Sequence, residues 1–314
     1  MFSEMTESIV VSVVVCTFNR AIFLRKCLAS LLNQENAPPF EIIVVDNNST
    51  DETATVVETI RRETIIPFQY IFLEEMGLSR ARNAGIHAAQ GALVAFIDDD
   101  AVADARWVQE IEKGFQLFPQ AVAQGGAVAG DYEIPRPAWL PDELLLAISV
   151  GDMGDEPRWM NAREAALGCN MAFRRETFCE HGEFLTTLGR TGLSLLAAEE
   201  VEFCLRLYKQ GMSILYNPRM RIKHWVPKER LTKTYIRQRM FWNGRSIART
   251  DLEWGNSVIA RSLARLLGAI PLAFLRMILV FRKLDGRFFF SCMIVKHWGY
   301  INEAWAMSSG GISK

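Results

Sequence analysis

The first hundred residues alternate between short apolar runs and segments whose apolar positions recur at helical spacing. The apolar runs are rich in Val, Ile and Phe, which is typical of strands that are covered on both faces. The segments between them repeat an apolar residue every three or four positions, as one side of a helix does. The pattern predicts strands over 9–16, 40–45, 68–73 and 92–97, separated by helices over 21–33, 51–62 and 79–90.

This alternation predicts an α/β fold, with a Rossmann-like, mainly parallel sheet that is flanked by helices. In such sheets, ligands bind beyond the carboxyl ends of the strands. Polar residues follow the strands at that edge, at 17–20, 46–49 and 98–100. We therefore expect the functional site there.

The middle of the chain is less regular. Residues 125–165 are rich in Gly and Pro, and we interpret them as loops that form a candidate lid. The spacing of apolar residues predicts a helix over 199–210, ended by Gly211. Two short apolar runs, 214–216 and 222–225, predict further strands.

The second part of the chain is basic. Residues 219–298 hold 17 Lys and Arg against 4 Asp and Glu, whereas residues 1–218 hold 17 against 31. The basic region indicates an acidic partner, such as anionic lipid, a phosphate-bearing acceptor or nucleic acid, or else it neutralises the acidic part within the fold. We predict an α/β domain over 1–226 and a basic, apolar helical appendage over 227–314.

Residues 258–281 are apolar but are interrupted by Arg261, Arg265 and Arg276. The longest uncharged run among them is ten residues, and a helix that spans a bilayer needs about twenty. An interfacial helix fits this pattern, with the arginines among lipid headgroups and the aromatic residues 288–290 as anchors. The core helices of a small soluble bundle fit it as well.

The N-terminus and the cysteines indicate in which cellular compartment the protein resides. The first eight residues lack the basic start and apolar stretch of a signal peptide. None of the six cysteines belongs to a C-x-x-C pair, and most lie in apolar runs, as small buried side chains do in a reducing compartment. We expect a cytoplasmic protein, either free or peripheral on the inner face of the cell membrane.

Asp98, Asp99 and Asp100 form an acidic triplet at the end of the fourth predicted strand. Adjacent carboxylates repel one another, and a divalent cation relieves the repulsion, since Mg²⁺ and Mn²⁺ bridge carboxylates to substrate phosphates. An extended strand would place Asp98 and Asp100 on one face, whereas a turn would alter that geometry. The alternative is a solvated acidic loop with a helix N-cap at Asp104.

Five motifs then occur in an order that resembles a known family: VVVCTFNR at 13–20, EIIVVDNNSTDET at 41–53, GLSRARNAG at 77–85, AFIDDD at 95–100 and AEEVEFCLRLYKQG at 198–211. They are similar to the landmarks of the glycosyltransferase family 2 enzymes, which are inverting transferases with the GT-A fold. The resemblance covers residues 9–226. It departs from the family at Cys16, where a proline is usual, and at Glu200, where an aspartate is usual.

The resemblance implies a nucleotide-sugar site. Thr17 and Asn19 match the loop that contacts the nucleotide, Asp46 matches the acid that binds its base, and Arg82 matches a basic residue near the phosphates. Because a carboxylate can accept the imide N–H of uracil, Asp46 favours a UDP-sugar.

The metal and the catalytic base follow from the same resemblance. Asp98 and Asp100 match the outer acids of the Asp-x-Asp motif, which hold ribose and metal, and we expect Asp98 and Asp99 to contact the donor. His224 matches a further metal ligand, a structural histidine being the alternative.

The pair Glu199 and Glu200 matches the Glu-Asp element whose second acid is the catalytic base. Glutamate performs the same proton transfer from a longer side chain, so either Glu200 or Glu199 takes the role. Alternatively, these acids only stabilise the first turn of a helix.

The implied function is metal-dependent, with Mn²⁺ or Mg²⁺, and transfers a sugar with inversion to an acceptor hydroxyl in polysaccharide, glycolipid or other glycan assembly. The expected partners are the nucleotide-sugar donor, a glycan or lipid-linked acceptor and an anionic membrane surface, and not nucleic acid. A non-catalytic binding or scaffold protein on the same fold is the alternative. A dinucleotide-dependent oxidoreductase is excluded because residues 16–21 contain no glycine, and a P-loop nucleotidase is excluded because its Gly-Lys-Ser/Thr motif is absent.

Overall fold

The computed structural model describes residues 8–161, 164–191, 195–279 and 284–308. The chain divides into two compact units. Unit 1 comprises residues 1–130, 151–186 and 200–225, and unit 2 comprises residues 131–150, 187–199 and 226–314. Unit 2 therefore includes two segments that precede residue 226.

Unit 1 is built on a mixed sheet that has nine strands within the described residues, in the order β3-β2-β1-β4-β8-β6-β9-β5, with β7 paired to β9. The strands are β1 (Val11–Thr17), β2 (Phe40–Asp46), β3 (Phe68–Phe72), β4 (Leu93–Asp98), β5 (Ala101–Ala103), β6 (Ala121–Tyr132), β7 (Arg158–Trp159), β8 (Asn170–Arg174) and β9 (Ser213–Val226).

Strands β1 to β4 are joined by parallel pairs. The pairs β4–β8, β6–β8, β5–β9 and β7–β9 are antiparallel. The four strands predicted from the apolar runs form the parallel part, each within two residues of its predicted bounds. The α/β fold with flanking helices is confirmed, and the sheet is mixed rather than mainly parallel.

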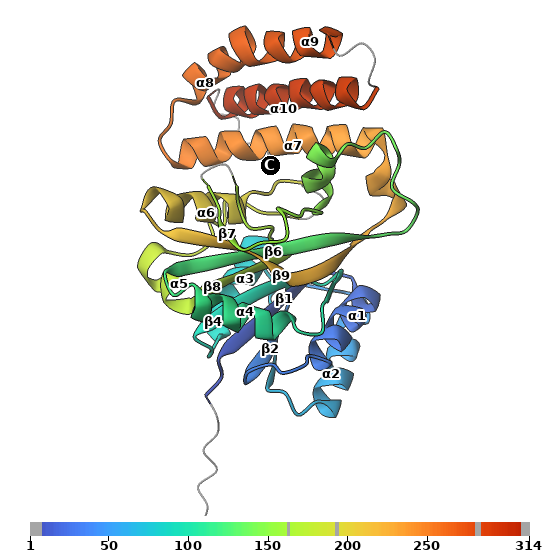
Figure 1. The fold of residues 1–314 in the computed structure, drawn as a ribbon, viewed down its shortest axis with the longest axis vertical. Coiled ribbons are helices and arrows are strands. Elements are labelled where there is room, and N and C mark those ends of the chain that lie inside the picture. Colours follow the sequence, from blue (N-terminus) through green and yellow to red (C-terminus); the bar gives the residue numbers. More distant parts are fainter. Residues whose placement is uncertain (1–7, 162–163, 192–194, 280–283, 309–314) are drawn as a thin grey trace, which may run out of the picture. The chain divides into compact units, whose positions relative to one another are not determined.

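Helices cover both faces of this sheet (Figure 1). Val11, Val13 and Val15 of β1 pack in one hydrophobic cluster with α1 (Ala21–Leu32), α2 (Thr53–Glu63) and α4 (Trp107–Leu117). Val14 packs in a second cluster with α3 (Leu78–Ala88), α5 (Arg175–His181) and α6 (Glu199–Lys209). Successive side chains of a strand point to opposite faces, so two covered faces account for the continuous apolar runs.

The prediction of loops over 125–165 is wrong at its start, because 121–132 is strand β6. The adjacent glycines Gly125 and Gly126 of β6 mark close approach rather than a turn. A Cβ at Gly126 would lie 1.9 Å from the carbonyl oxygen of Met220 on β9, and one at Gly125 would lie 2.7 Å from Met160 Cε. Glycine inside a strand often has this cause. The two strands predicted over 214–225 are likewise one strand, β9.

Unit 2 is mainly helical in its described residues. Its elements are η1 (Asp142–Ile148), η2 (Lys228–Leu231), α7 (Lys233–Glu253), α8 (Val258–Ala264), the π-helical turn η3 (Arg265–Ala269), α9 (Ile270–Leu279) and α10 (Leu284–Ser308). Helices α7 and α10 cross where glycines let the backbones touch. A Cβ at Gly244 would lie 1.9 Å from the carbonyl oxygen of Lys296, and one at Gly299 would lie 2.0 Å from that of Phe241.

The segment 258–279 runs through α8, η3 and α9 and stays largely exposed. It has 22 residues and a mean hydropathy of 1.7, and 11% of it is buried. Among the described residues, this helix alone is long and apolar enough to cross a membrane. Because arginines interrupt the apolar residues of this segment, the sequence did not predict an apolar helix of that length. The small buried fraction of the segment does not fit the core of a soluble bundle. Residues 280 and 281 of the predicted segment lie outside the described residues.

Candidate active site

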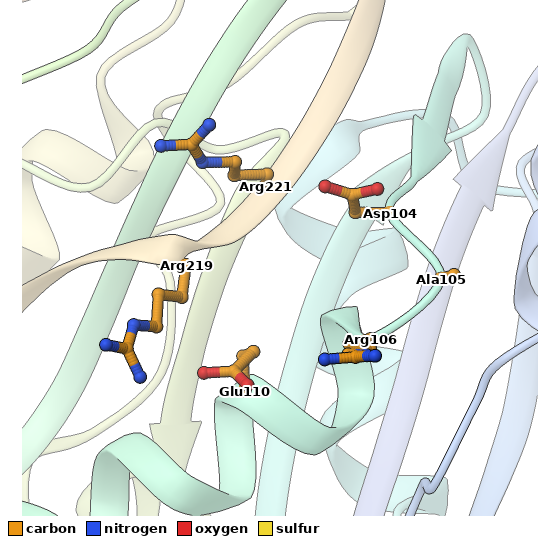
Figure 2. Close-up of a pocket in the computed structure, with 6 residues that line it drawn as sticks. All are labelled: Asp104, Ala105, Arg106, Glu110, Arg219 and Arg221. Carbon is orange, nitrogen blue, oxygen red and sulfur yellow. The ribbon is translucent and has the colours of Figure 1, made fainter. Parts of the chain in front are cut away.

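A pocket of about 330 Å³ lies beside β9, but the predicted site residues do not line it (Figure 2). It is lined by Asp104, Ala105, Arg106, Glu110, Arg219 and Arg221. Exposed and buried residues alternate along this part of β9, with Arg219 and Arg221 exposed and His224 buried. Because successive strand residues face opposite sides, this pocket lies on the other side of β9 from His224.

Asp98, Asp100 and His224 come together at the carboxyl edge of the parallel strands. Asp98 ends β4, and a turn at Asp99 and Asp100 leads into β5. Strand β5 pairs with β9 so that Ala101 lies opposite His224. One ligand atom from each of Asp98, Asp100 and His224 therefore lies within 4.8 Å of the others.

The donor set suits a divalent cation. His224 is 2% exposed, and its Nε2 lies 3.2 Å from Asp100 Oδ1. Its Nδ1 is buried and has no hydrogen-bond partner among the described residues. Such an orphaned buried nitrogen costs free energy unless it gains a partner. Two carboxylates and one imidazole form a ligand set that Mn²⁺ accepts.

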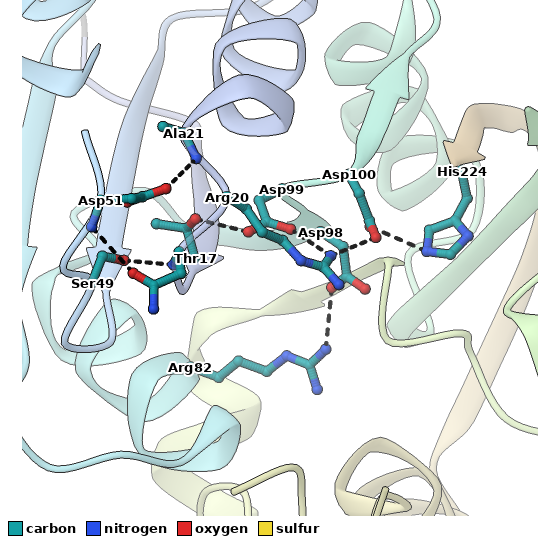
Figure 3. Close-up of polar contacts among 11 residues, drawn as sticks. Thr17, Arg20, Ala21, Ser49, Asp51, Arg82, Asp98, Asp99, Asp100 and His224 are labelled. Atoms are coloured by element: carbon teal, nitrogen blue, oxygen red, sulfur yellow. Dashed lines mark hydrogen bonds and ion pairs between the residues drawn. The ribbon is translucent and has the colours of Figure 1, made fainter. Parts of the chain in front are cut away.

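Arg20, which the sequence pattern did not single out, holds two of the three aspartates (Figure 3). Its Nη1 donates to Asp99 Oδ1 at 3.2 Å and to Asp100 Oδ2 at 2.5 Å. Thr17 Oγ1 donates to the other oxygen of Asp99 at 2.7 Å. Asp99 is therefore held by the loop after β1. The signal was present in the sequence, since Arg20 stands in the same polar loop as Thr17.

The charges at this cluster depend on one another. Burial raises the pKa of Asp99 above its usual range, Arg20 opposes this effect, and Asp100 adds to it. Burial favours the neutral form of Arg20, but the carboxylates of Asp99 and Asp100 outweigh it and raise the pKa of Arg20. The guanidinium thus stays charged and offsets part of the repulsion among the acids.

Asn19 ties the loop after β1 to the loop after β2. It lies in the left-handed region, with a φ of 51°. Its side-chain oxygen accepts a hydrogen bond from the backbone N–H of Thr50 at 2.7 Å, and its own N–H donates to Ser49 Oγ at 2.9 Å. Asp51 of the same loop accepts from the N–H of Ala21 at 3.0 Å, at the start of α1.

Asp46 is buried at the end of β2 and is 1% exposed. One carboxylate oxygen accepts from the N–H of Ser49 at 2.8 Å, and the other accepts from the hydroxyl of Tyr70 at 2.7 Å. Each carboxylate oxygen can accept more than one hydrogen bond. Asp46 therefore shapes its loop and keeps some capacity to accept from a ligand.

Arg82 approaches the cluster from α3 and is 3% exposed. Its Nη2 donates to the carbonyl oxygen of Gly168 at 3.0 Å and lies 3.7 Å from Asp98 Oδ1. Its guanidinium carbon lies 5.7 Å from the ring centre of Phe184 and 6.0 Å from that of Phe96. This packing holds a positive charge beside Asp98.

Glu199 and Glu200 are the first residues of α6, as predicted. Glu199 is buried at 2% exposure, whereas Glu200 is partly exposed. Ala198 directly before them has a φ of 87°, which residues other than glycine rarely adopt.

Cys169 lies within electrostatic range of both this helix start and the acidic cluster of Asp98 and Asp100. Burial raises the pKa of its thiol well above the usual value, and Asp98, Asp100 and Glu200 raise it further. The three carboxylates therefore lie within electrostatic range of one buried side chain.

A doubly flanked mixed sheet with a carboxylate–imidazole cluster at its carboxyl edge agrees with the GT-A fold that the five sequence motifs imply. Comparison with known proteins agrees. The family described as Glycosyl transferase family 2 matches residues 12–181, more than half of the chain. The chain therefore belongs to glycosyl transferase family 2 and is a glycosyltransferase.

Two relatives cover most of the chain. It is 30% identical over 245 residues to glucosyl-dolichyl phosphate glucuronosyltransferase of Haloferax volcanii, a match that covers 77% of each protein. It is 25% identical over 248 residues to succinoglycan biosynthesis protein ExoM of Rhizobium meliloti, which covers 77% of this chain and 75% of that protein.

Solved structures share the fold. The chain is similar to mannosyltransferase PcManGT from Pyrobaculum calidifontis in complex with GDP-Man and Mn²⁺, with a TM-score of 0.57 and 17% identity, over 98% of this chain and 77% of that one. It is also similar to S. aureus TarS 1–349, with a TM-score of 0.55 and 17% identity, over 98% of this chain and 93% of that one.

Proposed function

We propose that this glycosyltransferase uses a divalent cation, Mn²⁺ or Mg²⁺, that Asp98, Asp100 and His224 hold. The observation that carries this proposal is the convergence of the three side chains, with ligand atoms within 4.8 Å of one another. The buried Nδ1 of His224 adds to it. When bound, such a cation neutralises charge on a leaving diphosphate. The mannosyltransferase of the same fold, in complex with GDP-Man and Mn²⁺, supports this reading.

The donor is a nucleotide-diphosphate sugar, and a UDP-sugar is favoured. Asp46 lies in the loop after β2, where its remaining acceptor capacity suits the imide N–H of uracil. Asn19 and Thr17 hold the neighbouring loop in shape, and Arg82 offers its charge to the phosphates beside Asp98. Asp98 reaches the donor, and Asp99 anchors the loop after β1; its contacts with Thr17 and Arg20 support this role.

Glu200 is the general base of an inverting displacement. The acceptor oxygen attacks the anomeric carbon, the bond to the diphosphate breaks, and the hydroxyl proton passes to the Glu200 carboxylate. The anomeric configuration inverts because a single displacement occurs. Glu200 is favoured over Glu199 because Glu200 is partly exposed and Glu199 is buried. The start of α6 also favours the ionised carboxylate through the helix dipole.

A donor screen tests the metal and the nucleotide. UDP-, GDP- and TDP-sugars are incubated with the full chain and acceptor extracts, with Mn²⁺, Mg²⁺ or chelator, and nucleotide release is measured. Chelation, Asp98→Asn and His224→Gln should each abolish most of the release. Asp155→Asn is the matched control, since the Asp155 side chain is 93% exposed. Full release in the presence of chelator would refute metal dependence.

A second pair of variants tests the base. Glu200→Gln should lower kcat by about 100-fold or more and leave the KM for the donor close to the wild-type value. Glu199→Gln should change kcat far less. If Glu200→Gln kept wild-type turnover, its role as base would be excluded.

The acceptor is lipid-linked, and the chain lies peripherally on the inner face of the cell membrane. The exposed apolar segment 258–279 and the basic C-terminal region support this proposal. The relatives include a glucosyl-dolichyl phosphate glucuronosyltransferase and a glucosyltransferase whose name specifies an undecaprenol diphosphate substrate. Sedimentation with anionic liposomes at low salt tests it. A chain that stays in the supernatant without detergent would argue against membrane association.

A further inference from the structure

A group of cations in unit 2 has no part in the proposed transfer. Arg265 lies in η3, within the exposed apolar segment, and Lys296 and His297 lie on α10. The guanidinium carbon of Arg265 lies 3.4 Å from the ring centre of Tyr300. Tyr300 follows Lys296 by four positions, so the two share a face of α10. Arg265 and Lys296 are thus brought to one place from separate helices.

The acids of this region are already engaged by other groups. Asp251 accepts from the hydroxyl of Tyr300 at 2.8 Å and pairs with Arg261. Glu303 pairs with Arg249 at 2.6 Å and with Arg245.

Burial lowers the pKa of Arg265 and outweighs Tyr300 and Asp251, which favour its charged form, so Arg265 and Lys296 are left as excess positive charge. Within the described residues, neither of them has a carboxylate at ion-pair distance. Cations therefore outnumber acids in this part of the bundle.

The excess cations disfavour one another. Burial lowers the pKa of Lys296, and the charge of Arg265 lowers it further. His297 responds in the same way, since burial, Arg265 and Lys296 all lower its pKa. Two like charges in a partly buried position destabilise the fold unless an anion joins them.

The surroundings of these cations are apolar and exposed. Leu266 and Leu267, next to Arg265, are 47% and 77% exposed. On α10, Trp298 and Trp305 are 55% and 75% exposed. Tryptophans and apolar side chains beside basic groups are typical of surfaces that meet the lipid headgroup region.

We propose that Arg265 and Lys296 form a binding site for the phosphate group of an anionic membrane lipid. The proposal rests on the membrane association proposed above and names the residues that would confer lipid selectivity. Arg265 and Lys296 supply the charge. The adjoining apolar segment takes the acyl chains.

Vesicle binding by the full chain tests the site. The vesicles are phosphatidylcholine with or without phosphatidylglycerol, and binding is measured by flotation. Lys296→Met and Arg265→Gln should each weaken binding to the anionic vesicles by at least tenfold. Arg276→Gln is the matched control, because Arg276 is an exposed arginine of the same apolar segment. General surface attraction is worth about fivefold per basic residue, so the control should lose no more than that.

A stability measurement separates lipid binding from a structural role. Lys296→Met removes a repelled charge, so its thermal midpoint should equal or exceed that of the wild type. Lys296→Arg should restore vesicle binding to within about twofold of wild type. Equal losses in Lys296→Met, Arg265→Gln and Arg276→Gln would overturn the site, as would a failure of Lys296→Arg to restore binding.

Soluble anions distinguish phosphate recognition from diffuse charge. At equal ionic strength, inorganic phosphate should release more of the wild-type protein from anionic vesicles than chloride does. Equal release by both would overturn phosphate recognition. Wild-type protein that binds no vesicles would overturn both the site and membrane association, whereas the donor screen decides the transferase mechanism independently.

Discussion

Replacing Arg20 by glutamine would remove the charge that holds Asp99 and the proposed metal ligand Asp100. Arg20 Nη1 lies 3.2 Å from Asp99 Oδ1 and 2.5 Å from Asp100 Oδ2. The side chains of these aspartates are 6% and 4% exposed, whereas that of Arg20 is 35% exposed. The variant would leave two nearly buried carboxylates beside each other without their guanidinium.

The expected loss of stability lies between two known limits. Removing one partner of a buried ion pair costs about 3–5 kcal/mol, and an exposed pair contributes about 0–1 kcal/mol. Because Arg20 is about one-third exposed, solvent screens part of its interaction. Thr17 also continues to donate to Asp99. We expect a loss of about 2 kcal/mol, or about 4–8 °C in the thermal midpoint.

Differential scanning calorimetry in chelator and in saturating Mn²⁺ measures this effect. In chelator, the full loss should appear. With Mn²⁺, the difference in thermal midpoint between variant and wild type should shrink. A cation that binds only the folded chain adds stability. Its charge also takes the place of the Arg20 guanidinium in offsetting the repulsion between the aspartates.

Arg106→Gln is the control for losing an arginine. Arg106 is 65% exposed and lies 3.7 Å from Glu35, so its loss should cost less than about 1 kcal/mol, with or without Mn²⁺. The reasoning is refuted if Arg20→Gln is no more destabilising than Arg106→Gln, or if Mn²⁺ leaves its deficit unchanged.

Three further substitutions test the packing and the backbone. Gly299→Ala should lower the free energy of unfolding by about 1–3 kcal/mol in urea denaturation, because its Cβ would lie 2.0 Å from the carbonyl oxygen of Phe241; an unchanged value would contradict the close crossing of α7 and α10. Ala198→Gly should raise the free energy of unfolding by about 1 kcal/mol, because it relieves a φ of 87°; a decrease would contradict the strain. The hydroxyl of Tyr216 donates to Asp152 at 2.7 Å and lowers the pKa of this carboxyl. The stability that this contact contributes is present above the unfolded pKa and is lost as pH falls through the lowered folded pKa. The thermal midpoints of Asp152→Asn and wild type should therefore differ near neutral pH and converge in acid. A difference in midpoint that persists in acid would contradict this assignment.

Several features of the fold could be predicted because they depend on local patterns. The runs that became β1, β2 and β4 are apolar on both faces, and α1 shows a clear stripe, so their bounds were predicted within two residues. The polar residues after these strands could be placed at one edge, since carboxyl ends of parallel strands meet there. The start of α6 at Glu199 was also predicted.

Other features depend on contacts between distant parts of the chain. The adjacent glycines of β6 led us to predict a loop. Their side chains are absent because Met220 and Met160 approach closely, and both residues lie far along the sequence. Arg20 was missed because its partners, Asp99 and Asp100, follow about eighty positions later. Contact with Arg20 and Thr17 also changed the role that we propose for Asp99.

By itself, the sequence determined the parallel strands, their flanking helices and the edge at which acids gather, because periodicity and strand ends are properties of neighbouring residues. The family resemblance implied that His224 joins Asp98 and Asp100, but only the tertiary structure brings the three together, because the antiparallel pairing of β5 with β9 sets that meeting. It also decided that Arg265 packs on the ring of Tyr300, one turn of α10 from Lys296. The physical reason is the same in both cases: charges act through space, and the chain's fold sets their distances.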